Sequence, residues 1–247
     1  MNSVFTALSS AFSDLFRFRV LWIMVWPLLG AVLLWLLLGI TFSNLFSDWI
    51  GSVLAEIGIQ SWLDNLGPGW VAHTIQVIVY LLLFLPLVFI TALVMTALFA
   101  MPALIRLVSE RDYPQLKREN GGSSAGSLIN ALLGMPIFIA MWLITFPLWF
   151  AGVGAILPFI ASAYLNQRLF RYDALAEHAS LEEMSAIFFI YRTSLWGLGM
   201  LTGLVQFIPF VNVFAPVLTA LAFIHFCLAR LAELRRSPRE VLLRVTN

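Results

Sequence analysis

The chain has 247 residues, of which 61% are hydrophobic and only 11% are charged, and its mean hydropathy is +0.94. This composition leaves too little polar surface to coat a soluble globule, so it excludes a soluble fold and indicates an integral membrane protein. The net charge of +1 offers no basic surface for nucleic acid, and none is expected as a partner.

The first part of the chain predicts a surface helix followed by a membrane span. In residues 1–18, apolar side chains recur at helical spacing while serines and Asp14 fill the other face, which is typical of an amphipathic helix at a membrane interface. Residues 20–41 carry no charge, and at about 1.5 Å per residue they can cross a hydrocarbon core of roughly 30 Å as a helix. This run predicts the first transmembrane helix.

An acidic segment and a second apolar run follow. Residues 43–70 contain Asp and Glu but no Lys or Arg, with tryptophans spaced along them, which predicts an external loop with aromatic anchors. Residues 71–105 form an uncharged stretch longer than one bilayer crossing, so a second transmembrane helix there must tilt, bend or project. Pro86 and Pro102 offer places to bend.

The remainder predicts two helical hairpins joined by charged segments. Residues 106–127 read as a cytoplasmic connector that ends in a flexible Gly/Ser linker. The uncharged stretches 128–167 and 193–229 are each broken near the middle by Pro with Gly or Asn, which predicts hairpins. Their arms are short for a bilayer, so we expect them to penetrate it only halfway or to tilt strongly. Residues 168–192 and 230–247 are expected in the cytoplasm.

The basic residues decide the predicted topology, because Lys and Arg accumulate on the cytoplasmic side of membrane proteins. None of the 14 lies at 43–70, and two spans followed by two hairpins place them all on one side with both termini. They fall before the first span, in the connector, between the hairpins, and at the end of the second hairpin and in the tail: Arg17, Arg19; Arg106, Arg111, Lys117, Arg118; Arg168, Arg171, Arg192; Arg230, Arg235, Arg236, Arg239, Arg244.

Two sets of residues are candidates for contact with an anion. Arg17 and Arg19, just ahead of the first span, could clamp a dianion with charge-assisted hydrogen bonds, or could only mark topology. Gly152, Gly154 and Asn212 at the hairpin tips could expose backbone N–H groups to a transport path, or could only let the chain reverse.

The sequence shows no motif that is typical of an enzyme active site. No catalytic triad order, phosphate-binding loop or dinucleotide motif appears, and no metal or cofactor is expected. The apolar runs contain no Asp, Glu, Lys or Arg, which disfavours a carrier built on buried carboxylates. His225 on its apolar run reads as an interhelical hydrogen bonder, and the lone Cys227 as a buried apolar side chain.

Three short motifs resemble the family that joins bacterial CysZ sulfate permeases with the etoposide-induced membrane proteins. They are Trp-Pro-Leu-Leu at 26–29, Phe-Arg-Tyr-Asp-Ala-Leu-Ala-Glu-His-Ala-Ser at 170–180 and Ile-Pro-Phe-Val-Asn-Val-Phe-Ala-Pro at 208–216. The resemblance covers roughly residues 5–230. It implies two long membrane helices plus two hemi-penetrating hairpins. For CysZ members it also implies oligomers that take up sulfate for cysteine synthesis.

One departure concerns the residues ahead of the first span. CysZ proteins that resemble this chain carry a Gly-Leu-Arg element there, tied to sulfate binding, whereas this chain reads Leu-Phe-Arg-Phe-Arg at 15–19. Only Arg17 and Arg19 carry over.

The expected function is therefore a non-enzymatic permease or channel for a small inorganic anion, with sulfate as the candidate. We expect a homo-oligomer in contact with membrane lipid, placed in a bacterial inner membrane with cytoplasmic termini. The alternative is a non-transporting membrane scaffold or biogenesis factor of the same family.

Overall fold

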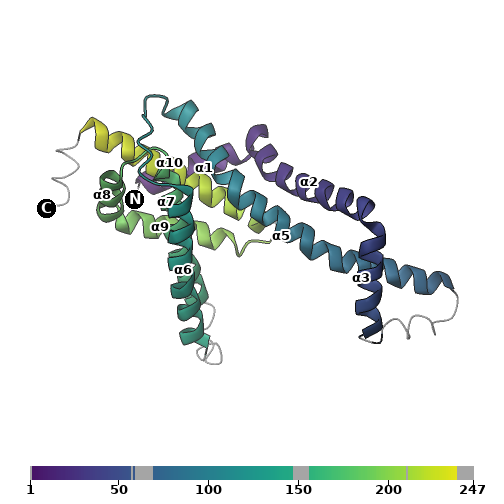
Figure 1. Ribbon diagram of the computed structural model, residues 1–247. Helices are drawn as coiled ribbons and strands as arrows, with labels where there is room; N and C mark the ends of the chain where they lie inside the picture. The colour runs from purple at the N-terminus through teal and green to yellow at the C-terminus, as the bar shows by residue number, and fades with distance from the viewer. Residues whose placement is uncertain (1, 57, 59–68, 147–155, 210, 238–247) are drawn as a thin grey trace. The chain divides into compact units, whose positions relative to one another are not determined.

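The computed structural model describes residues 2–56, 58, 69–146, 156–209 and 211–237, and this part of the chain is helical with no strand. The predicted all-α fold is confirmed. It divides into two compact units, Trp22–Ala100 and the combination of Met1–Leu21 with Met101–Asn247. The elements, drawn in Figure 1, are α1 (Asn2–Leu15), α2 (Phe18–Thr41), α3 (Ser43–Glu56), α5 (Gly69–Asp112), α6 (Ser124–Thr145), α7 (Ile156–Ala176), α8 (Leu181–Ile190), α9 (Arg192–Val205), the 3-10 helix η2 (Val211–Val213) and α10 (Ala215–Arg236).

In the unit Trp22–Ala100, helix α2 covers the run predicted as the first span and is long and apolar enough to cross a membrane. Aromatic side chains join it to α5. The indole N–H of Trp35 donates to the hydroxyl of Thr91 at 3.0 Å, and the same ring meets Phe84 edge-on. Because most of α2 is exposed in this unit, its apolar side chains are available to lipid.

Two features of this unit differ from the sequence expectation. Residues 43–56, expected within an external loop, form the helix α3, and Phe46 on that helix packs edge-on against Phe84. Pro86 and Pro102, which the sequence offers as places to bend, do not interrupt α5, which runs as 44 residues of helix, or about 66 Å at about 1.5 Å per residue. Its length exceeds one bilayer crossing, as the sequence indicated.

The second unit is built around α10. This helix contacts α1, α7, α8 and α9, and its side chains are buried almost without interruption from Val217 to Leu228, Cys227 included as predicted. It is long and apolar enough to span a membrane, yet protein covers 83% of its most apolar window. The expected second arm of the hairpin at 193–229 is therefore longer than predicted. Helix α10 continues to Arg236, so the first seven residues of the segment predicted as the cytoplasmic tail, 230–236, are helical.

The helices around α10 pack closely through small residues. A Cβ at Gly199 of α9 would lie 2.8 Å from the carbonyl oxygen of Ala163 on α7, so only glycine allows this approach. Helices α8 and α9 form a pair bent by 77°, and α8 starts with a capping box in which Ser180 and Glu183 exchange side-chain and backbone hydrogen bonds.

The connector before α6 is fastened to the protein, whereas the sequence predicted a flexible linker. Residues 119–122 donate four backbone hydrogen bonds, of 2.9–3.4 Å, to carbonyl groups at 176–179 in the turn after α7. Arg235 of α10 strengthens the junction. Its guanidinium donates to the carbonyl oxygens of Lys117 and His178 and to the carboxylate of Glu183, at 2.8–2.9 Å. One arginine therefore ties together the connector, the turn after α7 and α8.

Candidate functional site

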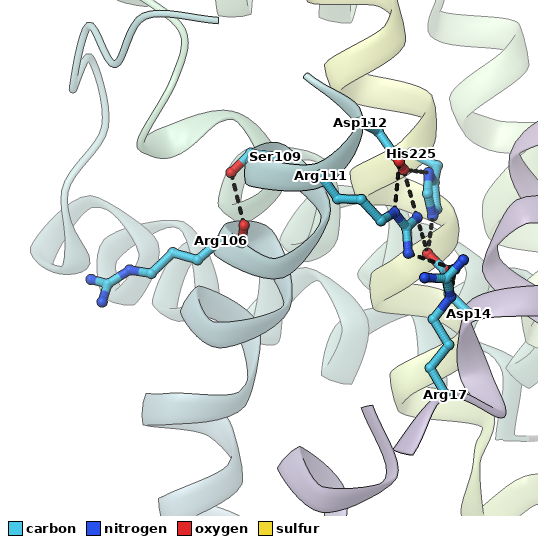
Figure 2. A network of polar contacts seen from close by, with 7 residues as sticks. All are labelled: Asp14, Arg17, Arg106, Ser109, Arg111, Asp112 and His225. Atoms are coloured by element: carbon cyan, nitrogen blue, oxygen red, sulfur yellow. Dashed lines mark hydrogen bonds and ion pairs between the residues drawn. The ribbon is translucent and has the colours of Figure 1, made fainter. Parts of the chain in front are cut away.

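Four segments bring charged side chains together in the unit around α10, as Figure 2 shows. Asp14 stands in the last turn of α1, Arg17 in the bend between α1 and α2, Arg111 and Asp112 at the end of α5, and His225 in the middle of α10. We call these five residues the Asp14 cluster. Asp14 and Arg17 come close to each other because α1 ends at Leu15 and α2 begins at Phe18, with a bend between them.

Asp14 is the centre of the cluster. Its carboxylate accepts two hydrogen bonds from Arg111, Nη1 to Oδ1 at 2.9 Å and Nη2 to Oδ2 at 2.6 Å, which is a bidentate pair. His225 Nε2 lies 2.9 Å from Asp14 Oδ2, and Arg17 Nε lies 2.7 Å from Oδ1. With its side chain only 4% exposed, Asp14 has exchanged water for three protein partners. The interhelical hydrogen bond predicted for His225 is confirmed.

Arg111 also bridges to its neighbour. Its Nε and Nη2 donate to the two carboxylate oxygens of Asp112, both at 2.6 Å, so this single guanidinium binds two carboxylates.

Burial by itself would raise the pKa of Asp14. The hydrogen bonds that Asp14 accepts from Arg111 and His225, together with the positive charge of Arg111, outweigh burial and hold that pKa below its ordinary value. The pKa of Arg111 is raised by its hydrogen bonds to Asp112 and Asp14. The cluster is thus an ionised, internally neutralised network.

The same cluster has ligand atoms spaced as in a cation site. One ligand atom each from Asp14, Asp112 and His225 lies within 4.8 Å of the others. Arg111 already supplies a positive charge to both carboxylates. The geometry is therefore that of a salt-bridge network around a guanidinium, and the network joins α1 to α5 and α10.

Arg17 and Arg19, the predicted anion ligands, line one pocket of about 480 Å³ together with Phe18, Leu107, Glu110 and Arg111. In one continuous helix, residues two apart would point about 200° apart. The bend at Phe16 and Arg17 removes that obstacle, since Arg17 lies outside both helices and its carbonyl accepts the first backbone hydrogen bonds of α2. Arg19 has no ion-pair partner among the described residues. Arg106, by contrast, points away from the Asp14 cluster in Figure 2.

Of the three predicted hairpin-tip residues, the structure describes only Asn212. Gly152 and Gly154 lie outside the described residues. Asn212 is in η2 with an exposed side chain, but its backbone N–H donates to the carbonyl of Ile208 at 3.1 Å. The N–H groups at 206–208 and 214 are also paired within the tip. Local turns therefore pair the backbone donors of these tip residues, and a role for Asn212 in a transport path stays a prediction.

Sequence reasoning missed Asp14, Arg111 and Asp112 as members of a site. The sequence puts Asp14 on the polar face of a surface helix and Arg111 among the topology signals, and it assigns Asp112 no role. The contacts join residues 97 and 211 positions apart, which no local pattern reveals. One signal was present: Asp14 is the only acidic residue in the first 47 and lies beside the arginine pair.

Comparison with known proteins identifies the family of the chain. Residues 7–216 match the family model described as sulfate transporter CysZ/etoposide-induced protein 2.4. No curated protein and no solved structure gives a significant match. The family match covers most of the chain, and the described residues include two helices long and apolar enough to span a membrane, α2 and α10. The chain therefore belongs to the sulfate transporter CysZ/etoposide-induced protein 2.4 family of membrane proteins.

Proposed function

We propose that the protein is a non-enzymatic permease or channel for a small inorganic anion, with sulfate as the substrate, working as a homo-oligomer in a bacterial inner membrane. The observation that carries the proposal is the pocket lined by Arg17, Arg19 and Arg111, whose residues include a single carboxylate, that of Glu110. Membership of the family supports the same class of substrate.

The charges in this pocket favour the binding of an anion beside Arg17 and Arg19. Arg111 is engaged by both Asp14 and Asp112, and Arg17 is paired with Asp14, its Nε lying 2.7 Å from Oδ1. Arg19 has no ion-pair partner among the described residues, so its guanidinium is open to an anion. Forked N–H donors of this kind match the oxygen geometry of a tetrahedral dianion. The Asp14 cluster holds Arg17 in place, and the anion takes the donors that Asp14 leaves open.

The double substitution Arg17→Lys/Arg19→Lys tests the pocket. It keeps both charges but removes the forks, so sulfate binding should weaken by about tenfold to a hundredfold, as expected for the loss of charge-assisted hydrogen bonds. Binding is measured with labelled sulfate on detergent-purified protein. Uptake into liposomes is then compared for sulfate, thiosulfate, phosphate and chloride.

The matched control is Arg106→Lys, because Arg106 is an exposed arginine that points away from the cluster. Wild-type sulfate affinity in the double-lysine protein would remove Arg17 and Arg19 from the site and leave them as topology signals. If folded protein transports none of the four anions, the non-transporting scaffold or biogenesis factor becomes the better description.

The hairpin tip at 208–216 is proposed to line the path. Its support is now the exposed amide side chain of Asn212, since the backbone donors there are paired. Asn212→Leu should lower sulfate flux by about tenfold, the effect of losing one polar contact of about 1.4 kcal/mol, with insertion unchanged. Asn44→Leu, at an exposed position of α3, is the control. Flux in Asn212→Leu equal to that of the control would place the path elsewhere.

The proposed orientation has both termini in the cytoplasm and α3 outside, and it rests on the distribution of Lys and Arg. In a Cys227→Ala background, a cysteine at exposed Ser52 should react with a membrane-impermeant thiol reagent added to intact cells. A cysteine at exposed Ser185 of α8 should react only after lysis. External labelling at Ser185 would contradict the hairpin topology.

A further inference from the structure

Helix α7 carries two arginines, Arg168 and Arg171, that lack carboxylate partners among the described residues. They are three positions apart, so they share one face of the helix. Both are half-buried where α7 packs against α6, α9 and α10. Partly buried charges are normally paired, because losing water costs free energy that only an opposite charge or hydrogen bonds recover. Here neutral groups contact both side chains, but no carboxylate among the described residues neutralises either charge.

Arg168 is held in a fixed orientation by neutral groups. Its Nε donates to Asn130 Oδ1 on α6 at 3.2 Å, and its Nη1 donates to the hydroxyl of Tyr164, one turn earlier on α7, at 2.7 Å. Asn130 Nδ2 donates in turn to the Arg168 carbonyl at 2.9 Å. Gly134 of α6 makes room for the side chain, since a Cβ there would lie 3.2 Å from Arg168 Cδ. Nη2 has no partner among the described residues.

The guanidinium of Arg171 stacks on an aromatic ring, and its charge is not neutralised by a carboxylate among the described residues. Its guanidinium carbon lies 4.4 Å from the centre of the Phe188 ring on α8, a cation–π contact that fixes the plane but supplies no negative charge. Arg168 acts on it as a repelling like charge. Nearby carboxylates are used elsewhere, Asp173 with the hydroxyl of Ser127 and Glu183 with Arg235.

We propose that Arg168 and Arg171 together bind one tetrahedral oxyanion, either free sulfate or phosphate or the phosphate of an anionic lipid headgroup. Asn130 and Tyr164 act as positioning residues, because they hold Arg168 by Nε and one Nη1 hydrogen and leave its remaining donors for the ligand. An anion at this face relieves the repulsion between the two guanidinium groups. The site is separate from the Arg17/Arg19 pocket and does not depend on transport.

The experiment has two arms on detergent-purified, full-length protein in the Arg17→Lys/Arg19→Lys background. The first measures labelled sulfate binding by scintillation proximity, and the second measures retained phosphatidylglycerol by native mass spectrometry. Arg168→Gln and Arg171→Gln are compared with Arg106→Gln, an exposed arginine that also lacks an ion-pair partner among the described residues. A free-ion site should show sulfate binding weakened about tenfold to a hundredfold in both variants. A headgroup site should instead lose its lipid adduct.

Either result supports the site, provided that Arg106→Gln behaves as the parent. Sulfate affinity and lipid retention unchanged in both glutamine variants would overturn it. If a glutamine variant elutes as aggregate, Arg168→Lys and Arg171→Lys replace it, since they keep the charge and remove only the fork. Unchanged binding and lipid retention in folded lysine variants overturn the proposal equally. Absence of flux in liposomes would count against the proposed function and leave this binding result untouched.

Discussion

Asparagine in place of Asp14 is expected to lower the free energy of unfolding by about 2–3 kcal/mol. The change leaves the shape of the side chain but removes the charge that Arg111, Arg17 and His225 all face. Breaking a fully buried pair typically costs more. Here Arg111 is 31% exposed and keeps Asp112, so solvent and the second carboxylate recover part of the loss. Denaturant unfolding in detergent micelles measures the effect.

Asp48→Asn is the matched control, because Asp48 is exposed on α3 and has no ion-pair partner among the described residues. It should change stability by less than about 0.5 kcal/mol. Equal, small effects of both substitutions would show that the Asp14 cluster does not hold α1 against α10.

The effect of Asp14→Asn should also depend on pH. The folded pKa of Asp14 lies below its ordinary value of 3.8, so the unfolded chain binds more protons between the two values. The contribution of Asp14 is therefore complete above about pH 4 and is lost as the pH falls through the folded pKa. The stability gap between wild type and Asp14→Asn should narrow below about pH 4. A gap independent of pH would contradict the assigned charge.

A second large effect is expected from one methyl group at Gly121. A Cβ there would lie 2.4 Å from the carbonyl oxygen of Ala179, which is the acceptor of the Gly121 N–H at 2.9 Å. Both contacts are backbone, so no side chain can rotate away. Gly121→Ala should detach the connector from the turn after α7 and lower the free energy of unfolding by about 2–3 kcal/mol, measured in micelles.

Gly39→Ala controls for the added methyl group. Nothing lies within 4 Å of a Cβ at Gly39, and α2 continues on both sides of it. Alanine has the higher helix propensity, so this substitution should leave stability unchanged or raise it by up to about 1 kcal/mol. If Gly121→Ala were as harmless as Gly39→Ala, the connector would not be fastened in solution.

The sequence was informative wherever the signal is local. Apolar runs such as 20–41 exceed the length of a bilayer core, and a run of that kind forms a helix in lipid because every backbone group must be paired internally. Composition therefore determined the all-α membrane fold, and Pro with Asn at 208–216 placed the break between α9 and α10. The family could be identified on the same short motifs.

Other features failed because tertiary contacts decide them. Residues 43–56 are predicted as an external loop from their lack of Lys and Arg, and residues 119–122 as part of a linker, yet Phe84 and the carbonyls at 176–179 give them partners that are distant in sequence. The length of α10 was underestimated for the same reason. The sequence predicts Arg230 at the end of the second hairpin and Arg235 in the tail, whereas α10 continues to Arg236 with ion pairs of Arg230 to Glu233 and of Arg235 to Glu183.

What the sequence alone determined is thus the all-helical membrane class of the protein, because transfer free energy depends on composition and a backbone in lipid must pair its polar groups internally. Only the tertiary structure decided which charges meet. Asp14 and His225 are 211 positions apart, and the two arginines of α7 are recognisable as unpaired only when the surrounding carboxylates have been assigned to other partners. Ion pairing depends on distances of a few ångströms, and no period or spacing in the chain encodes these between separate helices.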